Sequence, residues 1–211
     1  MVFTTNRGFK RSRSSRKSTA GKSQKAEEIK RVAGRLVADK GYNAMSMREI
    51  GRAIGMNQAS LYYYFNGKED ILFEIMNAAM DEALAALQDI CAADIPSEEK
   101  LSRVLGLYAR DHAGDESNFT MPADGMQSLG ERHYLILLGK RKQYMLMIRS
   151  ILEGLAEENR LKEIDPTVAS YAFFGMIHYG IKWYHRDVPV VPDDLANGFV
   201  DVFTKGVLKE S

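Results

Sequence analysis

The sequence has little of what marks several classes of protein. It contains a single cysteine, Cys91, which excludes an internal disulfide and a cysteine-based metal cluster. Its first residues form no apolar segment of the kind found in signal peptides. No run approaches the roughly 18 apolar residues of a membrane span. We therefore expect a cytoplasmic protein with no membrane partner.

Motifs of catalysis are also missing. Gly21-Lys22-Ser23 matches the end of a phosphate-binding loop, but the chain has Arg16 where that loop needs its first glycine. The sequence shows neither a nucleophile elbow nor a metal-ligand pair. We predict that the protein is not an enzyme, that it has no catalytic or metal-ligating residues, and that it needs no cofactor.

Acidic residues are scarce in the N-terminal third. Residues 1–68 hold 15 Lys and Arg against 4 Asp and Glu, whereas residues 69–211 hold 14 against 24. The net charge of +1 thus divides into +11 and −10, which indicates an anionic partner such as nucleic acid for the basic part. Residues 1–21 are basic, contain no acid and have few apolar groups to offset ordering entropy. We expect a disordered arm there.

The hydrophobic pattern from about Ser23 onward is helical throughout. Apolar residues recur at three- and four-residue steps, and no segment shows the alternation of a strand. The pattern predicts an all-α protein. The expected helices run from Ser23 to Gly41, over 47–54, 58–65 and 97–113, around 117–129, over 131–158, 166–184 and 193–208, with a long helix starting at Lys68.

Two of the short helices are typical of a helix-turn-helix at about residues 45–64. Ser46 and Glu49 form a capping box that opens the first helix, and Asn57 caps the second after the turn at Gly55. In this motif the second helix enters the major groove with its N-terminal side chains foremost. The sequence therefore predicts a DNA-binding head.

The second helix carries side chains suited to DNA. Gln58 offers a bidentate amide, Ala59 a methyl group and Ser60 a hydroxyl to base edges. Three consecutive tyrosines point about 100° apart on a helix, so they cannot all pack in a core. We expect one to pack and two to reach DNA. Hydroxyls and one charge are available to phosphates from Tyr62, Tyr63, Tyr64 and Lys68.

The same region closely resembles the signature of the tetracycline-repressor (TetR) family. The resemblance spans roughly residues 22–82 and is carried by GYNAMSMREIG at 41–51, ASLYYYF at 59–65 and KED at 68–70. It implies an all-α homodimer that binds a pseudo-palindromic double-stranded DNA operator, usually as a repressor released by a small molecule. It places Arg48 and Gln58 at bases, and the following near phosphates or base edges: Ser60, Tyr62, Tyr63 and Lys68.

Two departures from the family pattern bear on the base sequence that is recognised. Tyr64 stands where the family usually has His, and Gln58-Ala59 stands where Lys-Gly is more common. The resemblance divides the chain into an arm over 1–21, a DNA-binding domain over 22–82, and a ligand-binding and dimerisation domain over 83–211.

In this family the last two helices of each subunit form a four-helix dimer interface. By resemblance, the interface candidates here are Phe199, Val202, Phe203 and Gly206, and the alternative is the internal core of one subunit. Methionines and aromatic residues at helical spacing suit an adaptable apolar pocket as well as a plain core. The candidates for an effector pocket are Tyr144, Met145, Phe173, Met176, His178 and Trp183.

Three functions remain open. The C-terminal third is similar to the branch of the family that regulates fatty-acid or steroid catabolism and responds to acyl-CoA thioesters. That branch commonly has Asn-Trp where this chain has His178-Tyr179, so an efflux regulator that senses cationic drugs is an alternative. An architectural DNA-binding protein is the third, although it has no need for a large acidic domain.

Overall fold

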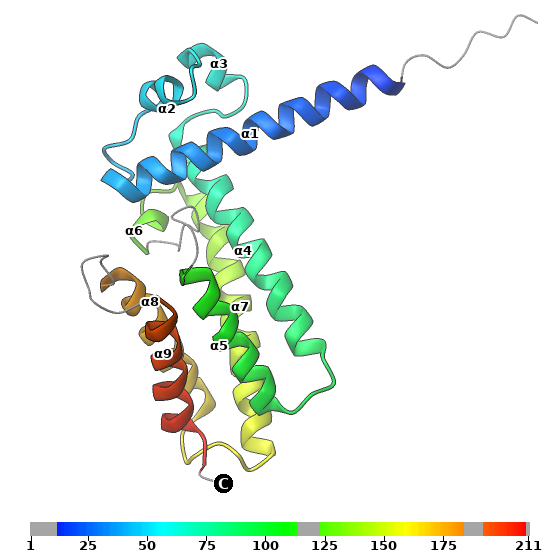
Figure 1. Ribbon diagram of the computed structural model, residues 1–211, viewed down its shortest axis with the longest axis vertical. Helices are drawn as coiled ribbons and strands as arrows, with labels where there is room; N and C mark the ends of the chain where they lie inside the picture. Colours follow the sequence, from blue (N-terminus) through cyan, green and yellow to red (C-terminus); the bar gives the residue numbers. More distant parts are fainter. Residues whose placement is uncertain (1–11, 114–122, 184–191, 210–211) are drawn as a thin grey trace, which may run out of the picture. The chain divides into compact units, whose positions relative to one another are not determined.

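The computed structural model describes residues 12–113, 123–183 and 192–209, and these residues are almost entirely helical (Figure 1). Within them, the only extended pairing is an isolated antiparallel bridge between Leu161 and Leu208. The predicted all-α fold is confirmed. The chain divides into two compact units, residues 1–72 and 73–211, and the division falls inside a helix.

The first unit contains α1 (Ser12–Lys40), α2 (Met47–Ala53), α3 (Gln58–Tyr62) and the first turn of α4 (Lys68–Ala92). One stripe of α1, spaced by four residues, is buried and forms the centre of the unit. The buried side chains are Ile29, Ala33 and Val37 from α1, with Met45, Met47, Ile50, Leu61, Phe65, Ile71 and Leu72 from the segments that follow.

The start of α1 differs from the sequence prediction. We expected disorder through residue 21, but the helix begins at Ser12. Arg, Lys and Ala favour helix, and a helix that is already formed extends without a second nucleation step. Because the apolar stripe farther along α1 is buried, that part of the helix is stable. The polar residues before it can continue the same helix, although they would not form one alone. The rest of the predicted arm, residues 1–11, lies outside the described residues.

Two glycines in the left-handed region set the turns of the first unit. Gly41 has φ +80° and its N–H donates to the Val37 carbonyl at 2.9 Å, which ends α1. Gly55 has φ +68° and separates α2 from α3. Glycine adopts these angles without the steric cost that a Cβ would bring, so both turns depend on it.

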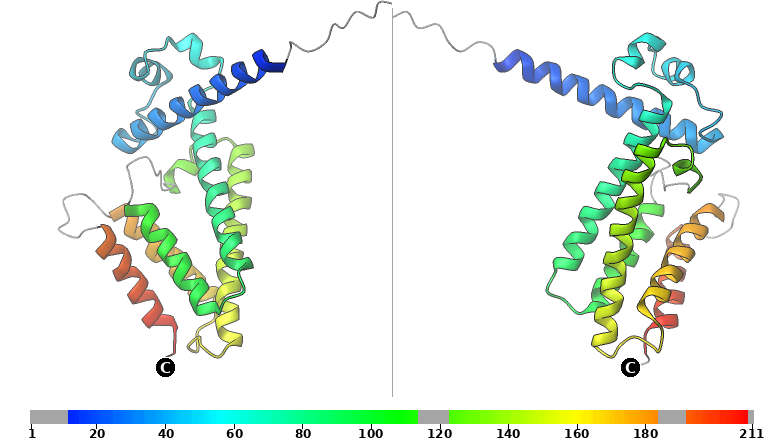
Figure 2. Two further views of the ribbon diagram at one scale, coloured as in Figure 1. Left: turned by 45° about the vertical axis from the view of Figure 1, so that its right-hand side comes forward. Right: turned by 180° about the vertical axis from the view of Figure 1, so that it is seen from behind.

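The second unit contains the rest of α4 with α5 (Ser97–Ala113), α6 (Ala123–Met126), α7 (Glu131–Glu157), α8 (Pro166–Trp183) and α9 (Pro192–Val207). Helix α5 packs against α9 and α7, α7 against α8, and α8 against α9 (Figure 2). The bounds predicted for α5, α7, α8 and α9 agree with the structure to within about one residue.

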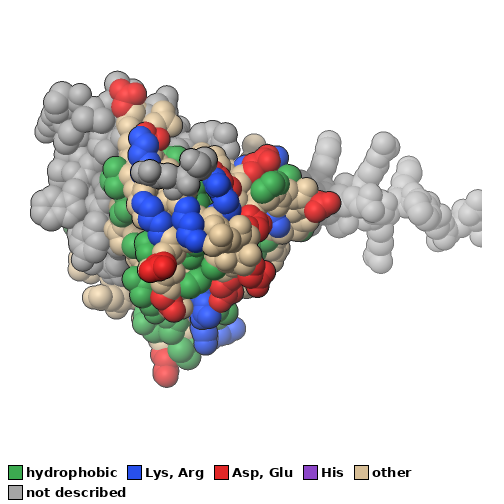
Figure 3. Space-filling view, turned by 90° about the horizontal axis from the view of Figure 1, so that it is seen from below, with side chains coloured by type: hydrophobic (Ala, Val, Ile, Leu, Met, Phe, Trp, Pro, Cys, Tyr) green, Lys and Arg blue, Asp and Glu red, His purple; other side chains and the backbone are tan. Residues whose placement is uncertain are grey.

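Polar contacts fix the ends of these helices to one another. The Arg160 guanidinium donates to Glu98 at 2.7 and 3.1 Å, and the Ser97 hydroxyl donates to Glu158 at 2.6 Å. Lys209 N–H donates to the Arg160 carbonyl at 2.8 Å, so the end of the described chain is tied to the loop before α8. The face in Figure 3 accordingly shows basic and acidic side chains interspersed. In the described part of the chain, the helices are too short or too polar to span a membrane.

Candidate nucleic-acid interface

Helix α2 is fixed at its start by the predicted cap. The Ser46 hydroxyl accepts from the Glu49 N–H at 3.3 Å and donates to the Glu49 carboxylate at 2.7 Å. That carboxylate also forms an ion pair with Lys40 at the end of α1. The hydrogen bond from Lys40, followed by that from Ser46, lowers the pKa of Glu49 from 4.5 to about 2. The carboxylate therefore joins α2 to α1 as well as capping it.

Helix α3 begins at the predicted cap and presents its first residues outward. Asn57 Oδ1 accepts from the Ser60 N–H at 2.7 Å. Gln58 and Ala59 are exposed, Ser60 is half-buried, and the Gln58 amide lies 3.5 Å from the Tyr62 hydroxyl. The helix ends at Tyr62, earlier than the predicted Phe65. The amide and the methyl group expected to meet base edges are thus free to do so.

A close approach of backbones holds α2 against α3. A Cβ on Gly51 would lie 2.6 Å from the Met56 carbonyl oxygen and 3.4 Å from Leu61 Cδ1. The Met56 N–H donates to the Gly51 carbonyl at 2.8 Å. Since real Cβ atoms do not come within 3 Å of a carbonyl oxygen, only glycine fits at this crossing.

The three tyrosines divide as expected between packing and exposure. Tyr62 is 50% exposed and Tyr63 is 67% exposed. Tyr64 is half-buried, and its ring stands edge-on to that of Tyr63 at 5.1 Å between centroids. Two hydroxyls therefore lie at the surface of α3 and its end. Their contact with DNA stays a prediction.

Lys68 begins α4, as expected, and makes contacts that the sequence did not predict. Its ammonium donates to the carbonyls of Tyr42, Asn43 and Met45 at 3.2, 3.4 and 3.2 Å. It also lies 4.4 Å from the centroid of the Tyr42 ring. An ammonium has three donors, so these carbonyls can engage all of them. The side chain therefore holds the turn between α1 and α2, and its contact with a phosphate stays a prediction.

Two exposed cations were missed from the sequence. The first is Arg52, which is exposed on α2. It lies four residues after Arg48, which is exposed as expected, and on the same face of the helix. That spacing was visible in the sequence. The second missed cation is Lys22, whose ammonium lies 4.4 Å from the centroid of the Tyr63 ring. It was missed because α1 was expected to begin after it.

Two of the effector-pocket candidates, Tyr144 and Phe173, lie in an aromatic cluster. Tyr144 is 4% exposed and Phe173 is 1% exposed. Phe174, which the sequence did not single out, joins them, with ring centroids 5.9 Å from Tyr144 and 5.4 Å from Phe173. Met145 and Met176 are half-buried. The side chains of two further candidates, His178 and Trp183, lie outside the described residues.

The dimer candidates on α9 separate into two groups. Val202 is 63% exposed, Gly206 is exposed and Phe199 is half-buried. Phe203 is different, because it is 3% exposed and its ring lies 5.4 Å from that of Phe173. Phe203 therefore belongs to the core of its own unit and is withdrawn as a surface candidate. Val168 and Tyr171, two apolar residues of α8 that are each 60% exposed, were not among the predicted interface candidates.

Comparison with known proteins identifies both parts of the chain. The family model "Bacterial regulatory proteins, tetR family" matches residues 29–75. The model "Tetracyclin repressor-like, C-terminal domain" matches residues 94–207, which is more than half of the chain.

Individual relatives agree with these matches. The chain is 22% identical over 191 residues to the HTH-type transcriptional repressor KstR2 of Rhodococcus jostii, covering 90% of this chain and 94% of that protein. It is 24% identical over 192 residues to the fatty acid metabolism regulator protein of Bacillus subtilis, covering 88% and 97%.

A solved structure shares the fold. The structure of AibR in complex with isovaleryl coenzyme A and operator DNA has a TM-score of 0.75 and 24% identity, covering 84% of this chain and 96% of that one. The helix-turn-helix, the helical second unit and the two family matches lead to one conclusion: the chain belongs to the TetR family of bacterial transcriptional regulators.

Proposed function

We propose that this regulator is a repressor that binds a pseudo-palindromic operator as a homodimer and is released by a small molecule. The observation that carries the proposal is the exposure of Gln58 and Ala59 at the capped start of α3. An amide at this place suits the adenine edge, and a methyl group suits thymine. The exposed Tyr62 and Tyr63 supply hydroxyls for phosphates that fix the register of the helix on the duplex.

Exposed apolar side chains on two packed helices support the homodimer. Val168 and Tyr171 on α8, and Val202 on α9, are each at least 60% exposed, and α8 packs against α9. A twofold dimer uses the same patch on both subunits, so one such patch is sufficient for a closed assembly. Burial of these side chains would stabilise the dimer through the hydrophobic effect.

We further propose an acyl-CoA thioester as the effector. The chain is related to a regulator of fatty acid metabolism, and AibR, which shares the fold, was solved with isovaleryl coenzyme A. The rings of Tyr144, Phe173 and Phe174 form an apolar cluster inside the second unit, and apolar and aromatic side chains of this kind suit an acyl chain. An effector releases DNA only if it binds the DNA-incompetent arrangement more tightly than the competent one.

Two measurements test the proposal with the full chain. Selection from a library of random duplexes should yield one discrete palindrome, and uniform recovery of all sequences would indicate an architectural protein instead. Release of that palindrome should then be measured with short-chain and long-chain acyl-CoA thioesters, free fatty acids and cationic drugs. Release by acyl-CoA alone is the expected result. Release by cationic drugs alone would replace the acyl-CoA proposal with an efflux regulator.

A further inference from the structure

We propose that Lys22, held over the face of Tyr63, contacts the DNA backbone and supplies a phosphate-neutralising charge from outside the helix-turn-helix. The inference rests on the proposed function in one respect, because it takes α3 to be the helix that faces DNA. It adds α1 to the interface, through a residue outside the helix-turn-helix.

The position of Lys22 links α1 to the end of α3. Its ammonium lies 4.4 Å from the centroid of the Tyr63 ring, well within the distance of about 6 Å at which a ring face attracts a cation. The Tyr64 ring supports Tyr63 edge-on. Tyr63 is nevertheless 67% exposed. The cation and the tyrosine hydroxyl are therefore presented together beside the proposed recognition helix.

Lys22 differs in its charge balance from Lys25 and Lys30, which follow it on α1. Lys25 pairs with Glu28 at 2.7 Å, and Lys30 pairs with Glu27 at 2.8 Å. Lys22 is exposed and forms no ion pair within the described parts of the chain. Its positive charge is thus left uncompensated by a carboxylate and remains available to a phosphate.

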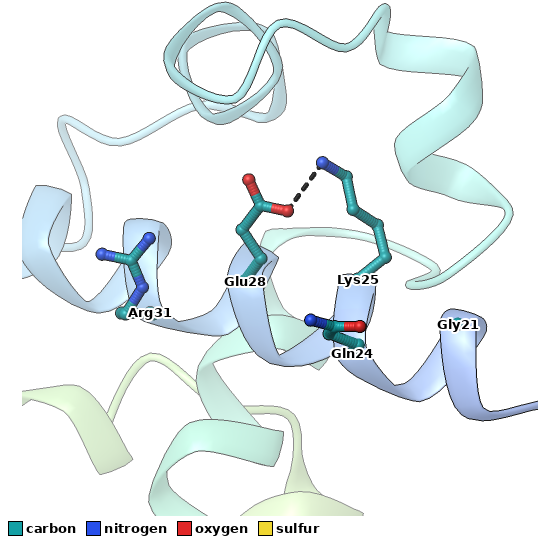
Figure 4. Close-up of a pocket in the computed structure, with 5 residues that line it drawn as sticks. All are labelled: Gly21, Gln24, Lys25, Glu28 and Arg31. Atoms are coloured by element: carbon teal, nitrogen blue, oxygen red, sulfur yellow. Dashed lines mark hydrogen bonds and ion pairs between the residues drawn. The ribbon is translucent and has the colours of Figure 1, made fainter.

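The pair made by Lys25 provides a matched control on the same helix. Figure 4 shows the Lys25 and Glu28 side chains directed toward one another at an open depression along α1. The depression has a volume of about 500 Å³ and is lined by Gly21, Gln24, Lys25, Glu28 and Arg31. A phosphate at Lys25 would have to compete with a carboxylate already in place.

Lys68 provides a second contrast, because it too lies 4.4 Å from a tyrosine ring. Its ammonium protons, however, are directed to three backbone carbonyls. A phosphate would need to displace carbonyls from Lys68 but only water from Lys22. We therefore expect the charge of Lys22 to be more available to a phosphate than that of Lys68, whose ammonium holds the turn between α1 and α2.

The salt dependence of binding separates these roles. The full chain is measured against its selected operator duplex over a series of salt concentrations. Loss of one phosphate contact lowers the slope of log affinity against log salt by about 0.9 for each bound chain. We expect this reduction for Lys22→Gln and an unchanged slope for Lys25→Gln. A wild-type slope for Lys22→Gln would overturn the proposal.

Lys68→Gln should show the opposite combination: an unchanged slope, weaker binding and a lower midpoint of thermal unfolding. A slope reduced by about 0.9 with an unchanged midpoint would make Lys68 the contact and overturn its positioning role. If Lys68→Gln does not fold, Lys68→Arg keeps the charge but not the geometry. We expect weaker binding with the wild-type slope, and wild-type binding would contradict the positioning role.

A double-mutant cycle tests the contribution of the ring. In the Tyr63→Leu background, Lys22→Gln should change operator affinity less than it does in the wild type, because the ammonium is no longer held. If the effects of the two substitutions on operator affinity simply add, the Tyr63 ring does not position Lys22. Failure to select any discrete operator would contradict the proposed function separately. A duplex of random sequence would then still test Lys22, since phosphate contacts do not depend on sequence.

Discussion

Gln58 is the side chain on which operator specificity should depend most. It is exposed at the first position of α3 and is held only loosely, 3.5 Å from the Tyr62 hydroxyl. Gln58→Ala should cost about 1–3 kcal/mol at the operator and leave binding to a random duplex nearly unchanged. Fluorescence anisotropy with both duplexes measures the difference. Gln88→Ala, at an exposed position of α4, is the control. An unaltered operator preference in Gln58→Ala would mean that another element recognises the bases.

Single residues also show where sequence reasoning stops. The exposure of Gln58 at the start of the second helix was predictable, whereas helical spacing predicted only that the three tyrosines could not all pack, not which of them is exposed. The inward direction of Lys68 was not predictable, because it depends on three carbonyls that only the folded turn brings together. The burial of Phe203 in its own unit was not predictable, for a related reason. An apolar residue on an amphipathic helix can face its own core or a partner, and the sequence pattern is the same for both.

The crossing of α2 and α3 depends on the absence of a side chain at Gly51. Gly51→Ala would bring a Cβ to 2.6 Å from the Met56 carbonyl oxygen, so the two helices must move apart. We expect a loss of about 1–3 kcal/mol in the free energy of unfolding, together with weaker operator binding. Denaturant unfolding followed by circular dichroism measures the first quantity.

Gly34→Ala is the matched control for Gly51→Ala. Gly34 is also a buried helical glycine, but no atom beyond its chain neighbours and the adjacent backbone of its own helix lies within 4 Å of its added Cβ. Alanine favours helix over glycine by up to about 1 kcal/mol, so this change should be neutral or stabilising. Equal destabilisation by the two substitutions would show that the close approach to Met56 is not the cause.

The ion pair between α1 and α2 should make the first unit sensitive to acid. The pKa of Glu49 is lowered from 4.5 to about 2 in the folded state, so its stabilisation is complete above pH 4.5 and is lost as the pH falls toward 2. Thermal midpoints of the wild type and Glu49→Gln should differ most above pH 4.5 and converge near pH 2. Glu157→Gln, an exposed change on α7, controls for the loss of a carboxylate. A constant gap between wild type and Glu49→Gln across this range would exclude the ion pair as its source.

Element boundaries were largely predictable, and the exceptions have a physical cause. Caps at Ser46 and Asn57 mark helix starts through hydrogen bonds that local sequence determines. The start of α1 at Ser12 depends on propagation from a buried stripe farther along the helix. Local composition in the first 21 residues therefore indicated disorder, although the tertiary packing beyond them supports a helix.

At the scale of the whole molecule, the division of charge agrees with the division of the fold. Residues 1–68, with their net charge of +11, lie wholly within the first compact unit, and the second unit contains most of the acidic residues. A basic unit attracts DNA at any sequence, and its specificity must come from α3. The acidic unit would repel the duplex.

Assembly is the property on which operator binding by the whole molecule should depend. Two half-sites about one turn of DNA apart, or a multiple of it, require two heads held at a matching distance. Val202→Glu places a charge on the exposed apolar patch of α8 and α9 without touching the core, because Val202 is 63% exposed. We expect monomers by light scattering, and operator affinity that falls toward the level of a random duplex. Leu146→Glu, at a 50% exposed position of α7, should leave the dimer intact. If Val202→Glu remains dimeric and binds the operator normally, the subunits associate through another surface.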